Sequence, residues 1–144
     1  MQLMMTGDEI MEMLDEVFPQ IHAGGRVYAI DNVSSGEATL RLSANELHLR
    51  PGGTVSGPSM MALADLAAYV VILAHIGKVA LAVTTHLSIN FMRKPAPCDL
   101  MAEARILKLG QRLAAGDVTI WSEGQEGEPV AHAQVTYSIP PEKG

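Results

Sequence analysis

The sequence is poor in cysteine, in aromatic residues and in charged residues. Cys98 is the only cysteine, so no disulfide can form within the chain, and a disulfide-stapled secreted domain is disfavoured. Charged residues make up 18% of the sequence and aromatic residues 4%, whereas hydrophobic residues make up 48%. This balance disfavours disorder and predicts a core filled mainly by aliphatic side chains and methionine. At 144 residues the chain has the size of one ordinary domain.

Basic residues are also scarce, which disfavours nucleic acid as a partner. The chain has 10 Lys and Arg against 16 Asp and Glu, and its formal net charge is −6. Binding to DNA or RNA relies on basic side chains that neutralise phosphates. A small anionic ligand needs only a local cluster of positive charge. Half of the basic residues fall in one short segment, namely Arg93, Lys94, Arg105, Lys108 and Arg112.

The sequence also lacks the features that direct a chain out of the cytoplasm or into a membrane. Acidic residues lie in the N-terminal stretch, where a signal peptide carries positive charge. The longest apolar run, Met60 to Ala74, contains Asp65 and is shorter than the roughly 20 residues that span a bilayer. We therefore expect a cytoplasmic protein with no membrane partner.

Local signals predict a short N-terminal helix and then a hairpin. Thr6 and Glu9 have the spacing of a capping box, and apolar residues recur at helical spacing until Pro19. Residues 1–24 are therefore predicted to form a helical segment. The segments 26–31 and 37–43 then flank a turn-like stretch and predict two paired strands.

A long helix is predicted after the hairpin. Ser56 or Gly57 can cap its start, Pro58 suits the first helical position, and Gly77 supplies the stop after Ile76. The run from Met60 to Ala74 is apolar on nearly every face. We therefore expect this helix to be the central element, wrapped by the rest of the chain.

Four strand-like segments follow, at residues 79–92, 100–110, 112–124 and 128–139. Their short connections predict antiparallel pairing in a four-stranded meander, since a parallel crossover needs a dozen or more residues. In the first segment, alternation places Val83, Leu87 and Ile89 on one face and Thr84 on the other. The elements together predict an α+β domain in which a curved antiparallel sheet wraps around one long buried helix. This architecture is called the hotdog fold.

Three stretches carry a resemblance to a known family: GGTVSGPSMMALAD, VTTHLSINFMRKPA and GQRLAAGDVTIWSEGQEGEPVAHAQVTYSIP. Their order and spacing resemble the acyl-CoA thioesterases of the phenylacetate-degradation (PaaI-like) branch of the hotdog superfamily, relatives of 4-hydroxybenzoyl-CoA thioesterase. The resemblance covers about Gly25 to Pro140. It implies a single hotdog domain over residues 1–144, with its core at 25–140.

Asp65 is the candidate catalytic residue. A carboxylate in an apolar helix needs hydrogen-bond partners or a changed ionisation, and it could be either a bonded core residue or a functional group. The resemblance implies the second, with Asp65 as general base towards water or as nucleophile towards a thioester carbonyl. It also implies that the backbone N–H near Gly57 stabilises the oxyanion at the positive end of the helix dipole.

The sequence departs from the family beside Gly57. Many members have His-Gly-Gly at this turn and an Asn shortly before it, whereas this chain has Ser56-Gly57-Pro58 and Arg50. Ser56 could hydrogen-bond the substrate or serve only as the helix cap. Thr84 lies where relatives often have a Ser or Thr that faces the reaction centre, although it could also be an ordinary strand residue.

Further residues are candidates for substrate binding. Arg93 and Lys94 after a predicted strand, and Arg112 in a predicted turn, could contact the phosphates of CoA. Met61, with Met60, could line an acyl pocket or simply fill the core. The five histidines are scattered without the spacing of a zinc site, and we expect neither a metal nor a cofactor.

The resemblance therefore predicts a homo-oligomer, dimer or tetramer, that hydrolyses an acyl-CoA to a carboxylic acid and free CoA. Two alternatives stay open at this point. The protein could bind acyl-CoA without catalysis, because the usual His and Asn are missing. It could also be a hotdog hydratase or dehydratase, although the His-plus-acid signature of those enzymes is absent from the sequence.

Overall fold

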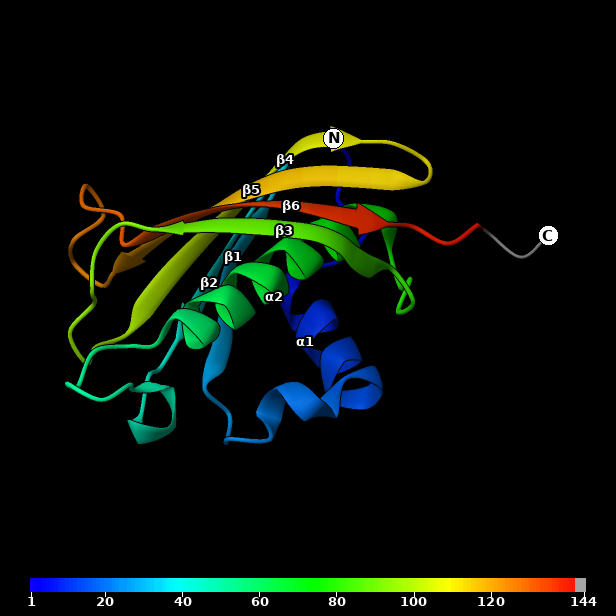
Figure 1. The fold of residues 1–144 in the computed structure, drawn as a ribbon. Helices are drawn as coiled ribbons and strands as arrows, with labels where there is room; N and C mark the ends of the chain where they lie inside the picture. Colours follow the sequence, from blue (N-terminus) through cyan, green and yellow to red (C-terminus); the bar gives the residue numbers. More distant parts are fainter. Residues whose placement is uncertain (142–144) are drawn as a thin grey trace.

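The computed structural model describes residues 1–141, in which a six-stranded antiparallel sheet curves over one long helix (Figure 1). The helical elements are α1 (Gly7–Val17), η1 (Pro19–His22), η2 (Glu46–His48) and α2 (Gly57–Ile76). The strands are β1 (Tyr28–Ser34), β2 (Glu37–Leu42), β3 (Val83–Phe91), β4 (Leu100–Leu109), β5 (Leu113–Ser122) and β6 (Ala131–Ser138). The predicted α+β hotdog architecture is confirmed.

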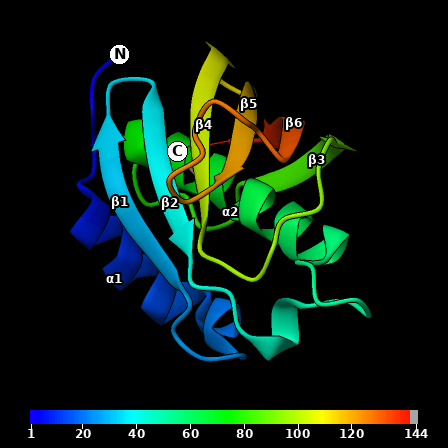
Figure 2. The ribbon, with the colours of Figure 1, turned by 90° about the vertical axis from the view of Figure 1, so that its left-hand side faces the viewer.

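The N-terminal helix α1 forms as predicted. The Thr6 side chain accepts a hydrogen bond from the Glu9 backbone at 3.2 Å, and the Glu9 carboxylate accepts one from the Thr6 backbone at 3.0 Å. These reciprocal bonds satisfy two N–H groups that have no partner inside the helix. The helix buries Ile10, Met13 and Leu14, lies beside β1 (Figure 2) and also packs against α2.

The start of α2 differs by one position from the prediction. Ser56 is the cap, and its side-chain oxygen accepts from the Ser59 N–H at 3.2 Å. The helix therefore begins at Gly57, and Pro58 is its second residue instead of its first. Proline fits both positions, because no N–H in the first turn has a partner within the helix. The predicted stop is confirmed at Gly77, whose φ is 87° and whose N–H donates to the Leu73 carbonyl at 2.9 Å.

The apolar helix α2 is buried along most of its length, as expected for the central element. By length and composition alone it could cross a membrane, but most of it packs inside the fold, which is the pattern of a core helix. Its N-terminal half is different. Met61 is 42% exposed, Pro58 and Ala62 are exposed, and Asp65 is half-buried. These four residues form a stripe along one side of α2 that this chain does not cover.

The sheet has the strand order β1-β2-β4-β5-β6-β3, and every neighbouring pair is antiparallel. The predicted hairpin and the β4-β5-β6 part of the meander are confirmed. The prediction that β3 pairs with β4 is wrong, because β3 pairs with β6 and β4 pairs with β2. The segment 92–99 contains two prolines and passes the start of α2, where the Val55 N–H donates to the Pro95 carbonyl at 3.0 Å. It therefore links two strands at different places in the sheet instead of forming a tight hairpin.

A β-bulge in β3 overturns the predicted alternation of that strand. Thr84 lies opposite Tyr137 and His86 opposite Thr136, so Thr85 is the extra residue. The bulge puts Thr84 on the same helix-facing side as Leu87 and Ile89, whereas Val83 is 56% exposed. The strand also begins only at Val83, later than predicted.

His75 ties the last turn of α2 to the β1–β2 turn. It is buried, its Nδ1 lies 2.7 Å from the Val71 carbonyl, and its Nε2 lies 2.9 Å from the Gly36 N–H. A carbonyl can only accept and an N–H can only donate. Nδ1 therefore carries the proton, Nε2 is the acceptor, and the ring is neutral.

We predict that His75→Leu destabilises the fold, because a side chain of similar volume then replaces both hydrogen bonds with apolar surface. The free energy of unfolding should fall by about 1–3 kcal/mol, measured by urea denaturation at fixed protein concentration. The exposed His86 provides the control, and His86→Leu should change the free energy of unfolding by less than about 0.5 kcal/mol. Equal free energies of unfolding for the two variants would show that the His75 hydrogen bonds contribute nothing to stability.

Candidate active site

Asp65 projects from α2 and meets side chains from two strands. Its Oδ1 accepts a hydrogen bond from Thr84 Oγ1 of β3 at 2.6 Å and another from the Tyr137 hydroxyl of β6 at 2.8 Å. The Tyr137 hydroxyl is also 3.1 Å from the main-chain carbonyl oxygen of Asp65. Thr84 reaches Asp65 only because the bulge turns it inwards. Among residues 1–141 no group donates a hydrogen bond to Asp65 Oδ2.

Aromatic rings surround this carboxylate. The rings of Tyr69 and Tyr137 stack with their centroids 5.7 Å apart, and Phe18 meets Tyr69 edge-on at 6.4 Å. The Tyr69 hydroxyl donates to the Ala80 carbonyl at 2.8 Å. Burial above all, and then the charge of Asp65, raise the pKa of Tyr137, while burial raises the pKa of Tyr69. Both phenols therefore stay protonated near neutral pH, and Tyr137 acts as a donor to Asp65.

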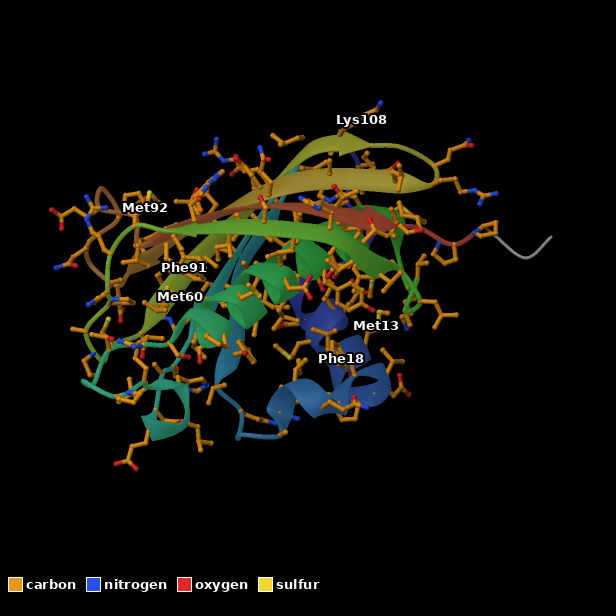
Figure 3. All side chains as sticks on the ribbon, viewed as in Figure 1. Met13, Phe18, Met60, Phe91, Met92 and Lys108 are labelled. Atoms are coloured by element: carbon orange, nitrogen blue, oxygen red, sulfur yellow. The ribbon has the colours of Figure 1, made fainter. Side chains whose placement is uncertain are left out.

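Two mainly apolar hollows adjoin Asp65. Their volumes are about 360 and 320 Å³, and both have Phe18, Asp65, Tyr69 and Tyr137 in their walls. Figure 3 shows Phe18 below α2 in that view, beside α1. Two larger hollows, one between the start of α1 and β1 and the other beside α1 and Lys78, do not include Asp65 in their walls. The hollows beside Asp65 have the size and lining expected of a small-molecule site.

The start of α2 offers an unused backbone donor. No group within residues 1–141 accepts a hydrogen bond from the Gly57 N–H, and the neighbouring Pro58 has no N–H. A Cβ at position 57 would lie 3.3 Å from the Phe91 ring, so a glycine relieves a tight contact there. The Ser56 hydroxyl is bonded to Ser59 Oγ at 2.9 Å and to the Ser59 N–H. The structure therefore shows Ser56 in its capping role.

One chain does not bring the two halves of the predicted catalytic site together. Gly57 and Asp65 are eight residues apart on one helix, which corresponds to about 12 Å along its axis. Asp65 and Thr84 are in contact, whereas Gly57 and Ser56 lie at the far end of this span. Met61 lies midway, on the exposed stripe.

The predicted phosphate-binding residues also separate into two places. Arg93 and Lys94 are exposed and follow β3 at the end where Gly57 lies, and Arg93 Nη1 donates to the Pro129 carbonyl at 2.5 Å. Arg112 is exposed in the β4–β5 turn at the other end of the sheet, where its carbonyl accepts from Ile139. The nine residues of β3 between these ends span about 30 Å. In Figure 3, Met92 and Lys108 mark these two ends.

Tyr137 is not among the candidate residues predicted from the sequence. A sequence signal for it was present, because Val135, Tyr137 and Ile139 alternate with other residues near the end of β6. All three are buried in the structure. A phenol on the buried face of a strand needs a hydrogen-bond partner, and Asp65 is that partner. For metal binding, no group of three or more His, Cys, Asp or Glu side chains gathers within residues 1–141.

Comparison with known proteins places this geometry in a family. The profile of the thioesterase superfamily matches residues 52–128. The structure is similar to that of an inferred thioesterase from Silicibacter sp., with 54% identity over 98% of this chain and 96% of that chain and a TM-score of 0.88.

More distant structures share the fold. A variant of the phenylacetic acid degradation protein PaaI from Thermus thermophilus has 27% identity over 85% of this chain and 99% of that chain, with a TM-score of 0.71. Zebra fish thioesterase superfamily member 2 has 18% identity over 94% and 99% of the two chains, with a TM-score of 0.80. No curated protein sequence matches the chain significantly. The family profile and the 54% identical structure establish that this chain belongs to the thioesterase superfamily, with its hotdog fold.

Proposed function

We propose that this protein hydrolyses acyl-CoA thioesters to a carboxylic acid and free CoA. Membership of the thioesterase superfamily implies a thioester substrate. The observation that carries the proposal is Asp65: one oxygen of its carboxylate is bonded to Thr84 and Tyr137, and its side chain borders two apolar hollows. These hollows can take an acyl group and leave its carbonyl carbon beside the carboxylate.

Asp65 can act in either of two ways. As a general base it takes a proton from water, whose oxygen bonds to the carbonyl carbon; the C–S bond then breaks and the leaving thiolate takes up that proton. As a nucleophile it bonds to the carbonyl carbon itself. Loss of the thiolate then gives a mixed anhydride, which water hydrolyses. Both routes pass through an oxyanion that needs a hydrogen-bond donor.

The free Gly57 N–H at the positive end of α2 is the proposed oxyanion donor. It lies too far from Asp65 of its own chain, because about 12 Å separates the two along the helix. Two copies of α2, packed antiparallel across their exposed stripes and centred near Met61, would place the partner subunit's Gly57 next to Asp65. We therefore propose a homodimer with two equivalent sites, each built from both chains.

The same pairing accounts for the separated basic residues. Arg93 and Lys94 lie at the end of the sheet that is near Gly57. Arg112 lies at the opposite end, where Tyr137 bonds Asp65. In the proposed dimer the partner's Arg93 and the partner's Lys94 would approach Arg112. A combined cluster of three positive charges could then bind the phosphates of CoA, whereas one chain offers a pair of charges at one end and a single arginine at the other.

One observation favours a second candidate, an acyl-CoA-binding protein without catalytic activity. The Ser56 hydroxyl is engaged as the helix cap, and Pro58 removes a neighbouring donor. The oxyanion site would then rest mainly on the Gly57 N–H, without the His that many relatives have. Turnover separates the two candidates, because a binding protein releases no thiol.

We predict that the wild-type protein releases free thiol from at least one member of a panel of aryl and aliphatic acyl-CoAs, followed with a thiol reagent. Asp65→Asn should lower this rate by about 100-fold or more, because an amide neither accepts the proton nor attacks the carbonyl. The amide is isosteric and its oxygen can still accept from Thr84 and Tyr137, so the melting temperature should change little. Retained turnover would exclude Asp65 as the catalytic group, and binding without thiol release would favour the second candidate.

We also predict that two inactive variants complement each other. Gly57→Pro removes the proposed oxyanion donor, and the extended backbone of Ser56, with φ −73° and ψ 154°, is compatible with a following proline. The added Cβ comes close to the Phe91 ring, which is 47% exposed and can shift towards solvent. A heterodimer of Asp65→Asn and Gly57→Pro chains contains one site with both groups intact. Purified through two different tags, it should have about half of the wild-type activity. A site built within one chain would give no activity in this heterodimer.

A further inference from the structure

We propose that Tyr137 is a positioning residue that fixes Oδ1 of Asp65, so that Oδ2 is the oxygen that reacts. This proposal rests on the proposed function. Both hydroxyl donors converge on Oδ1, at 2.6 Å from Thr84 and 2.8 Å from Tyr137. Within residues 1–141 no donor reaches Oδ2, whose lone pairs stay available for a proton or for a carbonyl carbon.

The Tyr137 hydroxyl touches the same residue twice. It is 2.8 Å from Oδ1 and 3.1 Å from the main-chain oxygen of Asp65. The single hydroxyl proton is shared between these two acceptors, with the shorter contact to Oδ1. A phenol held against both the side chain and the backbone of Asp65 opposes rotation about the Cα–Cβ bond of that residue. Thr84 restrains the same oxygen from a different strand. A carboxylate held in this way presents one oxygen in one direction, and reactive groups need this fixed orientation to act.

Tyr137 is itself held in place. Its side chain is buried, its ring stacks on Tyr69, and the Tyr69 hydroxyl is anchored on the Ala80 carbonyl. Because burial and the charge of Asp65 raise the pKa of Tyr137, the phenol remains a donor over the neutral range. The hydroxyl can therefore restrain Asp65 without ionising or moving away.

The test is Tyr137→Phe, which removes the hydroxyl and keeps the ring on Tyr69. The kcat should fall about tenfold or more, because fewer carboxylates then have the reactive orientation, while KM should change by less than about twofold. Thr84→Val should have the same signature, and the double variant should be slower than either single variant. Thr119→Val, which removes a half-buried hydroxyl elsewhere in the sheet, is the control and should keep the wild-type values.

Four results are distinguishable. An unchanged kcat in Tyr137→Phe overturns the positioning role, as does a parallel loss of activity and melting temperature without a separation of kcat from KM. A lower kcat with unchanged KM and melting temperature supports it. Absence of turnover in the wild-type protein refutes the proposed function instead, before any variant is compared.

A different observation carries a second inference, which also rests on the proposed function. Phe18 borders both hollows beside Asp65, the residue is 40% exposed, and its ring meets that of Tyr69 edge-on. The backbone at Phe18 is fixed, because its N–H donates to the Leu14 carbonyl at 2.8 Å. His22 Nε2, 2.8 Å from Asp15 Oδ1, holds η1 against α1. We infer that Phe18 limits the size of the acyl group.

The test compares Phe18→Ala with the wild-type protein. Loss of the ring enlarges both hollows, so kcat/KM for dodecanoyl-CoA relative to butyryl-CoA should rise by about tenfold. Leu107→Ala, which shortens an exposed side chain of β4, is the control and should leave this ratio unchanged. An unchanged ratio in Phe18→Ala, in a protein that still releases thiol, overturns the inference and leaves the proposed function intact.

Discussion

An α-helix that is apolar on nearly every side must be surrounded, and the rest of this structure depends on how α2 meets that demand. The sheet curves over most of α2, and α1 packs against part of it. One stripe near its N-terminus stays uncovered, from Pro58 to Asp65. The hydrophobic effect favours covering such a stripe, and a second copy of the same helix has matching chemistry. The need to bury the apolar surface of α2 therefore shapes the fold and also favours a site shared between two chains.

The same surroundings decide what a single carboxylate in α2 can do. Asp65 has few polar neighbours, and those within bonding distance are two hydroxyls that can donate without carrying a charge. An arginine or lysine in that place would form an ion pair and occupy the carboxylate fully. Neutral donors on one oxygen orient the group and leave its other oxygen open. Orientation without neutralisation suits a base or a nucleophile.

Local signals predicted the helices well, whereas the sheet and much of the site depend on distant pairings. Thr6, Ser56 and Gly77 mark helix ends through hydrogen bonds to residues three or four positions away, so the local sequence predicts these ends. The partner of β3 is about 50 residues away, and the bulge at Thr85 has no local signature. Tyr137 could be linked to Asp65 only once that register was known. Arg93 and Arg112 are close in sequence, but they lie at opposite ends of the strands.

The pairing of β3 with β6 sets the order in which the molecule can assemble. All elements up to β5 can be in place while β3 still lacks its partner strand, because β6 comes last along the sequence. Contacts of this range form slowly, and an unpaired strand beside an apolar helix is prone to aggregation in the meantime. The carboxylate acquires its phenol donor only when that final strand docks. During synthesis on the ribosome, β3 therefore gains its partner strand and Asp65 its phenol donor in the same event, when β6 docks.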